Sequence, residues 1–92
     1  MIFEWDENKN LENIEKHGVS FEYAQRAFVD RNHIIISDAK HSLQENRYYC
    51  VGSTDNDIIT VRFTKRNGNI RIIGAGYWRK QTKIYKTKNN LL

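Results

Sequence analysis

The sequence lacks several features that would each indicate a particular class of protein. Proline is absent, and the 92 residues include one cysteine, Cys50, which cannot form an internal disulfide. We interpret Cys50 as a small buried hydrophobe and expect a reducing, cytoplasmic compartment. No apolar run approaches the roughly 20 residues of a membrane span, and the acidic start MIFEWDENKN is unlike a signal peptide. We also find no phosphate-binding loop, dinucleotide fingerprint, nucleophile elbow or zinc motif, so no cofactor, metal or membrane contact is expected.

Acidic residues are missing from the last third of the chain. Residues 62–92 contain nine Lys or Arg and no acid, a net charge of +9, whereas residues 1–30 carry −4 and residues 31–61 carry −1. The stretch GAGYWRKQTKIYKTK, residues 74–88, combines five of these bases with three aromatic residues. Such segregation creates a local positive potential that attracts polyanions. RNA, DNA and an acidic protein all fit as partners, and so does a merely solvated, lysine-rich tail.

The first third predicts a short strand and two helices. Residues 2–5 alternate in polarity as a strand does. A helix is expected from a cap at Asp6 or Asn8 to about His17, because Gly18 is a typical stop, with Leu11 and Ile14 as its buried stripe. Ser20 then caps a second helix over residues 21–30.

The remainder predicts strands at residues 33–37, 47–53, 58–66 and 69–76. Asn67 and Gly68 are typical of a type I′ hairpin turn, which would place Thr64 opposite Arg71. The same register pairs Phe63 with Ile72, Arg62 with Ile73 and Val61 with Gly74. Alternation then gives an apolar face that should carry the two helices: Ile59, Val61, Phe63, Ile70 and Ile72. The other, partly open face carries Thr60, Arg62, Thr64, Arg71 and Ile73.

A short basic helix should end the chain, with Tyr77, Trp78, Ile84 and Tyr85 on one side at helical spacing. The elements together predict a single α+β domain over residues 1–92. In it, a short strand and two helices pack on an antiparallel meander of about four strands, followed by the basic helix, in two layers.

Three groups of residues can carry chemistry, and each has a structural alternative. Lys16 and His17 can bind phosphate and move protons, or can simply complement the helix C-terminus. His41 and Glu45, four residues apart, can form an acid/base pair or belong to an ordinary polar loop.

Arginines on an open sheet face can hold a phosphate bidentately. Aromatic rings near them can stack on RNA bases or pack the last helix onto the sheet, and at least one of Trp78 and Tyr85 should be core. The predicted RNA-binding residues are Arg62, Thr64, Tyr77, Trp78, Arg79, Lys80, Lys83 and Tyr85.

The stretches FEWDENKNLENIEKHGVSFEYA, DAKHSLQENR and IRII resemble the BrnT family of bacterial toxins over roughly residues 2–75. KHGVSFEYA is the most specific of these matches. The resemblance implies a RelE-like fold and metal-independent ribonuclease activity, in which basic residues hold the scissile phosphate while the RNA 2′-hydroxyl attacks. It also implies a DNA-binding, BrnA-like antitoxin as partner, in a toxin–antitoxin hetero-oligomer.

The resemblance points to six catalytic candidates: Lys16, His17, His41, Glu45, Arg47 and Arg71. Arg71 is the preferred phosphate contact, and Glu45 or His41 is the proton acceptor. Many relatives end the last strand with Ser-Ala-Arg, where this chain has Gly74, Ala75 and Gly76. Two other functions stay open: a non-catalytic RNA- or DNA-binding module of the same fold, and a protein-interaction module whose basic face binds an acidic partner.

Overall fold

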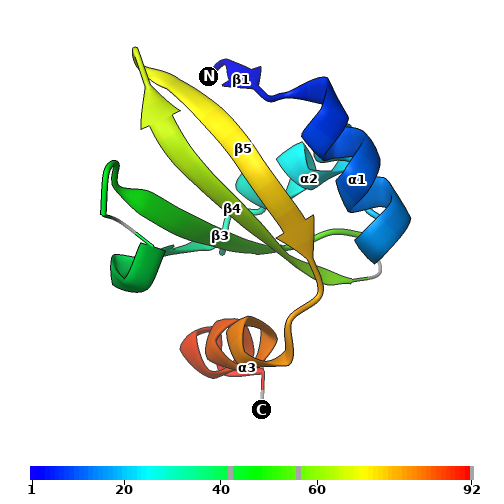
Figure 1. The fold of residues 1–92 in the computed structure, drawn as a ribbon. Coiled ribbons are helices and arrows are strands. Elements are labelled where there is room, and N and C mark those ends of the chain that lie inside the picture. The colour runs from blue at the N-terminus through cyan, green and yellow to red at the C-terminus, as the bar shows by residue number, and fades with distance from the viewer. Residues whose placement is uncertain (42, 56, 92) are drawn as a thin grey trace.

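The computed structural model describes residues 1–41, 43–55 and 57–91 and has the predicted α+β architecture. One mixed sheet has the strand order β1-β5-β4-β3-β2, in which β1 runs parallel to β5 and all other pairs are antiparallel (Figure 1). The elements are β1 (Phe3–Glu4), α1 (Glu7–His17), α2 (Phe21–Ala24), the 3₁₀ helix η1 (Gln25–Phe28), β2 (Ile34–Ser37), the 3₁₀ helix η2 (Ala39–His41), β3 (Arg47–Ser53), β4 (Ile58–Arg66), β5 (Asn69–Gly76) and α3 (Arg79–Lys88).

Local sequence signals determine most element boundaries. The strands β3, β4 and β5 match the predicted ranges residue for residue. Asn67 and Gly68 both have positive φ, 52° and 81°, as a type I′ turn requires. Asp6 caps α1 by accepting a hydrogen bond from the backbone N–H of Asn8, and Gly18 ends the helix with φ 69°.

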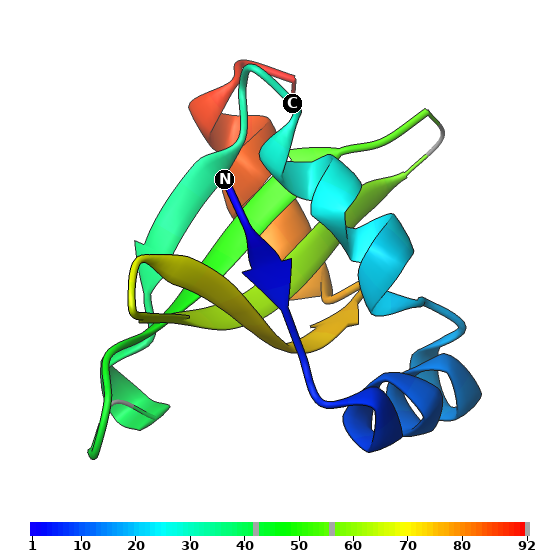
Figure 2. The ribbon, with the colours of Figure 1, turned by 90° about the horizontal axis from the view of Figure 1, so that it is seen from above.

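The first face of the sheet is the core, as predicted, but only the second of the two predicted helices contributes residues to it, because the inward side of α1 is polar. Its five predicted strand residues are at most 9% exposed: Ile59, Val61, Phe63, Ile70 and Ile72. They pack with Phe21, Ala24 and Ala27 of the α2–η1 segment, which crosses this face in Figure 2, and with Val19, which precedes α2. Phe28 contacts Phe63 edge to face, with ring centroids 5.2 Å apart. Burial of these side chains is the main stabilising contribution to the fold.

A β-bulge changes the predicted register halfway along the β4–β5 hairpin. Phe63 pairs with Ile72, but Arg62 pairs with Gly74 and not with Ile73, and Val61 pairs with Ala75 and not with Gly74. The extra residue, Ile73, lies opposite no single partner, as in a bulge. The predicted pairing is therefore correct near the turn and wrong beyond it, because a regular ladder cannot anticipate an inserted residue.

The predicted apolar stripe of α1 is wrong, since Leu11 and Ile14 are 58% and 41% exposed. The helix instead meets the protein through Asn13, which is 8% exposed. The Asn13 amide donates to the carbonyls of Val19 and Ala75 at 2.9 and 3.0 Å and accepts from the Ala75 N–H at 3.1 Å. Satisfying these buried backbone groups decides which side of α1 faces inward.

Helix α3 packs on the second face of the sheet, against β3 and β4. It starts at Arg79 with Trp78 as its N-cap residue, so Tyr77 and Trp78 precede the helix and the predicted four-residue helical face is wrong. Tyr85 is 3% exposed and donates its hydroxyl hydrogen to Asp30, which confirms that one of the two rings is core. No described helix is long and apolar enough to cross a membrane.

Asp30 joins three elements. Burial alone would raise the pKa of Asp30, but hydrogen bonds from the Ser53 N–H, the Tyr85 hydroxyl and the Asn32 N–H lower it below its usual value. Burial and the bond to Asp30 raise the pKa of Tyr85 to about 12. The carboxylate therefore links α3 to the end of η1 and to β3.

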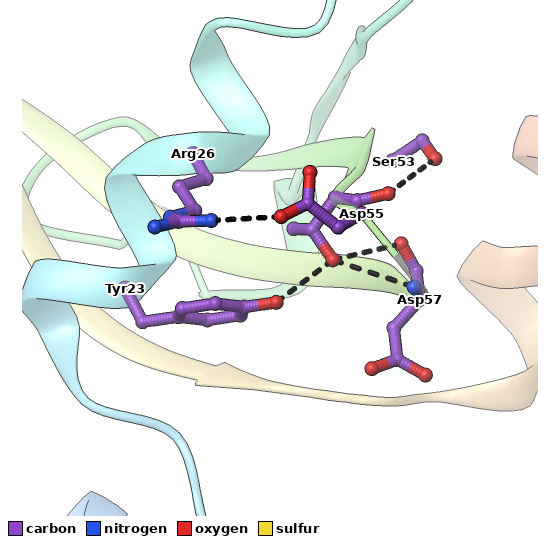
Figure 3. Close-up of polar contacts among 6 residues, drawn as sticks. Tyr23, Arg26, Ser53, Asp55 and Asp57 are labelled. Atoms are coloured by element: carbon purple, nitrogen blue, oxygen red, sulfur yellow. Dashed lines mark hydrogen bonds and ion pairs between the residues drawn. The ribbon is translucent and has the colours of Figure 1, made fainter.

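A second polar cluster fastens the β3–β4 turn to the α2–η1 segment, and Figure 3 shows Tyr23 and Arg26 directed towards that turn. The Tyr23 hydroxyl lies 2.9 Å from the Thr54 hydroxyl, which in turn bonds to both the backbone N–H and the carbonyl of Asp57. Arg26 lies 3.3 Å from the Asp55 carboxylate. The polar groups of this cluster form hydrogen bonds and an ion pair with one another, so their role is to stabilise the turn.

Candidate functional site

An open hollow of about 320 Å³ lies between α1 and the uncovered part of the second sheet face. Its lining residues are Lys9, Glu12, Asn13, Lys16, His17, Arg47, Arg62 and Ile73. Four of these side chains are cationic and one is acidic. The structure thus brings the predicted pair Lys16 and His17 together with the predicted Arg47 and Arg62, which come from β3 and β4.

Helix α1 supplies one wall of the hollow through side chains at helical spacing. Positions 9, 12, 13, 16 and 17 follow the i, i+3, i+4, i+7, i+8 pattern of one helical face. Lys9 was not among the predicted site residues. This polar periodicity was visible in the sequence, but the two apolar residues Leu11 and Ile14 pointed to a different inward side.

Arg62 forms the floor of the hollow and depends on the bulge. The bulge places Gly74 beside Arg62, and a Cβ atom at residue 74 would lie 3.1 Å from two of the guanidinium nitrogens. Glycine therefore lets the guanidinium approach the β5 backbone closely. Among the described residues Arg62 forms no ion pair, and its buried Nε has no hydrogen-bond partner. An anion can therefore bind Arg62 without displacing a carboxylate.

A second glycine accommodates an aromatic ring that contacts one residue of the hollow, His17. A Cβ atom at Gly76 would lie 2.9 Å from the Trp78 ring, so glycine makes room for the indole. The Trp78 ring in turn contacts the exposed His17 imidazole edge to face, with centroids 5.4 Å apart. Gly76 thus allows Trp78 to pack against a candidate catalytic histidine.

Arg47 borders a neighbouring hollow of about 280 Å³, which also contains His41 and Glu45. The His41 Nδ1 lies 2.8 Å from the carboxylate of Asp38, which is 8% exposed. Glu45 lies 3.8 Å from Arg47 and 3.4 Å from Arg66. The two predicted loop residues thus share one hollow but have different partners.

Asp38 is a candidate that the predicted site residues did not include. The Asp38 carboxylate is also hydrogen-bonded to Tyr49. Burial raises the pKa of Tyr49, and the charge of Asp38 and this hydrogen bond raise the same pKa further. A buried carboxylate bonded to one nitrogen of an exposed imidazole fixes the ring's orientation and tautomer. The sequence signal for this pair was the spacing of Asp38 and His41, which lie three residues apart before a predicted strand.

Eight predicted site residues line neither hollow. Five of them lie in α3 or directly before it: Tyr77, Trp78, Arg79, Lys80 and Lys83. The other three have partners elsewhere in the fold. Arg71 is on the second face, as predicted, but its guanidinium is 3.9 Å from the carboxylate of Glu4. Thr64 is 2% exposed and donates to the Asn46 carbonyl, and Tyr85 is buried against the sheet. We therefore leave Thr64 and Tyr85 out of the surface discussed below.

Cys50 is buried and belongs to the core, as predicted. Burial, together with the charge of Asp30, raises the pKa of the Cys50 thiol to about 12, which disfavours a nucleophilic thiolate. Within the described ranges, no group of three or more His, Cys, Asp or Glu side chains has the arrangement of a metal site.

The comparison with protein families agrees with the sequence resemblance. The model of the ribonuclease toxin BrnT, of type II toxin–antitoxin systems, matches residues 5–82. No curated protein that was compared with the chain matches it. The match includes α1, all four strands of the meander and the start of α3, and so contains every residue of the basic hollow. The chain belongs to the BrnT family of ribonuclease toxins of type II toxin–antitoxin systems.

Proposed function

We propose that this chain is an active endoribonuclease that cleaves RNA in the hollow between α1 and the second sheet face. The observation that carries the proposal is the convergence of Lys9, Lys16, Arg47 and Arg62 on one concave surface. Cations grouped in this way bind phosphate and stabilise charge that develops on it. Cleavage uses the RNA's own 2′-hydroxyl as nucleophile, so the reaction needs no metal ion.

The two arginines hold the scissile phosphate. Arg62 has no carboxylate partner among the described residues, and Arg47 faces the same hollow from the adjacent strand. Their planar guanidinium groups match two phosphate oxygens each. Arg71, paired with Glu4, has a smaller role on this proposal and contributes mainly to the positive field.

Two histidines supply the proton transfers, one from each hollow that Arg47 borders. The 2′-oxygen attacks phosphorus, the bond to the 5′-oxygen breaks, and the products are a 2′,3′-cyclic phosphate and a 5′-hydroxyl. His41, oriented by Asp38, accepts the proton of the 2′-hydroxyl. His17, supported by Trp78, donates a proton to the departing 5′-oxygen. Glu45 keeps Arg47 and Arg66 in place.

The RNA chain leaves the hollow along the start of α3. Tyr77 is 49% exposed, and its ring can stack on an unpaired base. Arg79 and Lys80, in the first turn of α3, are exposed and can bind the next phosphates. Lys83, one turn later, contributes to the same potential. A BrnA-like, DNA-binding antitoxin would inhibit such an enzyme by covering these cations in a hetero-oligomer. We also propose that the fold is RelE-like.

The test is cleavage of a labelled RNA by the purified chain in the presence of EDTA. We expect the wild type to cut and Arg62→Ala to lose about 10²- to 10³-fold in rate, the usual cost of removing one transition-state donor. Arg71→Ala should lose less. Lys65→Ala removes an exposed cation outside the hollow and is the matched control.

Salt-sensitive RNA binding without any cleavage would contradict the proposal and support a non-catalytic RNA- or DNA-binding module. The sequence favours that second function at one position: the family resemblance predicts an arginine at the end of the last strand, and this chain has Gly76 there. Products that end in a 2′,3′-cyclic phosphate would support the proposed reaction directly, whereas 3′-hydroxyl ends would contradict it.

A further inference from the structure

Strand β2 (Ile34–Ser37) is an edge of the sheet with an unusual composition. In the described part of the chain it pairs with β3 on one side and with no strand on the other. Three of its four residues are isoleucines, and Ile35 is 49% exposed. The opposite edge ends in the two-residue β1. An apolar edge with unpaired backbone groups is a template for an added strand.

The edge of β2 opens into a groove of about 550 Å³ that it shares with the C-terminal half of α3. The groove is lined by Ile34, Ile35, Ile36, Ser37, Ile84 and Lys88. A hydrogen bond from Asn89 to the Asn32 carbonyl, 3.3 Å long, holds this end of α3 beside the start of β2. In Figure 2 the C-terminal end of α3, in red, lies next to the start of β2. The groove is therefore formed by two elements that this hydrogen bond joins at one end.

The rim of the groove is positively charged. Ile84 and Lys88 also border a neighbouring hollow with Lys80, Lys83 and Thr87. Residues 62–92 contain no acid that would neutralise these lysines. An extended peptide in the groove would therefore have isoleucine side chains beneath it and three ammonium groups along one side.

We propose that β2 and the C-terminal half of α3 bind an extended, acidic segment of a partner protein as an additional strand of the sheet. The peptide backbone pairs with the free edge of β2, its apolar side chains contact the isoleucines, and its carboxylates face Lys83 and Lys88. Main-chain hydrogen bonds supply affinity, and the alternation of apolar and acidic residues supplies specificity.

This surface shares no residue with the basic hollow, although its Lys80 and Lys83 also lie on the proposed path of the RNA. Peptide binding is measured without RNA, so its outcome does not depend on whether the chain cleaves RNA. A second copy of the chain is a poorer occupant, because pairing β2 with β2 would bring two lysine-rich helices together. An acidic strand satisfies both the edge and the charge.

The probe is a blocked nine-residue peptide of alternating valine and glutamate, titrated into the ¹⁵N-labelled full chain. We expect amide shift changes confined to β2 and α3, slower hydrogen exchange in β2, and affinity that falls as salt rises. A peptide with lysine in place of glutamate should not bind. The variant Lys83→Glu/Lys88→Glu should weaken binding at least about tenfold, since like charges then face each other.

Two controls separate folding from docking. Ile35→Thr keeps a β-branched residue in the strand and should fold normally while binding more weakly. Lys40→Glu/Lys65→Glu makes the same charge change away from the groove and should bind as the wild type does.

Absence of binding at millimolar peptide would overturn the proposal, and so would shift changes centred on the basic hollow. Equal binding of the lysine peptide, or a dimer protected along β2 before any peptide is added, would overturn it as well.

Discussion

The two faces of the same sheet perform opposite tasks with side chains from the same strands. Along β4, Val61 and Phe63 point to the first face and are buried, whereas Arg62, between them, points to the second face and lies in the hollow. The first face gains stability because the α2–η1 segment removes its apolar side chains from water. The second face is covered by α3 over one part only.

Helix α3 covers only part of the second face, so the uncovered part stays open to water. Several cationic side chains can therefore lie near one another there. Where α3 packs, Val51 and Thr60 are fully buried, while the next row of the second face holds Arg62 beside Gly74. Alternate residues of one strand thus have different roles: those that point to the first face stabilise the core, and those that point to the second face form the site. Substitutions on neighbouring residues should therefore have different consequences.

The sharpest test compares Phe63→Ala with Arg62→Ala. Removing the buried Phe63 ring should cost about 3–5 kcal/mol of unfolding free energy. Arg62→Ala should cost about 1 kcal/mol or less, because it deletes no core contact, and yet should abolish most cleavage. Urea unfolding and the cleavage rate measure the two effects. A large loss of stability in Arg62→Ala would show that the arginine is part of the core.

Two glycines on opposite faces provide the next comparison. A Cβ atom at Gly52 would lie 2.2 Å from the Ala27 carbonyl oxygen, a backbone atom of η1, whereas the atoms nearest to a Cβ atom at Gly76 all belong to the Trp78 side chain. We expect Gly52→Ala to cost about 3 kcal/mol or more and Gly76→Ala about 1 kcal/mol, because a side chain can move aside. Gly76→Ala should also slow cleavage by displacing Trp78 from His17. Equal thermal shifts in the two variants would contradict this account.

Asn13→Ala tests whether the hydrogen bonds of Asn13 hold α1 against the rest of the fold. The substitution leaves the buried Ala75 N–H and the carbonyls of Val19 and Ala75 without their partner, at a cost of about 1–3 kcal/mol. Leu11→Ala on the same helix is the matched control and should change stability by about 0.5 kcal/mol or less, since Leu11 is exposed. Denaturant unfolding measures both losses of stability. A larger loss in Leu11→Ala than in Asn13→Ala would contradict this account and support the apolar stripe that the sequence predicted.

The smallest effect is a pH dependence at Asp30. The pKa of Asp30 is lower in the folded chain than its usual value, so the carboxylate stabilises the fold above the unfolded pKa. This contribution is lost as the pH falls through the lower, folded pKa. The difference in melting temperature between wild type and Asp30→Asn should therefore be present at neutral pH and shrink in acid. Asp55→Asn, on an 85% exposed side chain, should show no such trend.

The sequence by itself determined the local structure and the family. Caps at Asp6 and Ser20, the stop at Gly18 and the turn at Asn67 and Gly68 act within a few residues, so their signals are complete in the sequence. Alternation along β4 likewise determined which residues form the core. The motif around Lys16 and His17 indicated the family that the comparison then established.

Only the tertiary structure decided which of these residues meet. The bulge at Ile73 places Gly74 under Arg62, and the three hydrogen bonds of Asn13 turn the polar side of α1 towards the sheet. The space at Gly76 brings Trp78 to His17. Each of these contacts joins residues far apart in the chain, and its energy depends on partners that local periodicity does not specify.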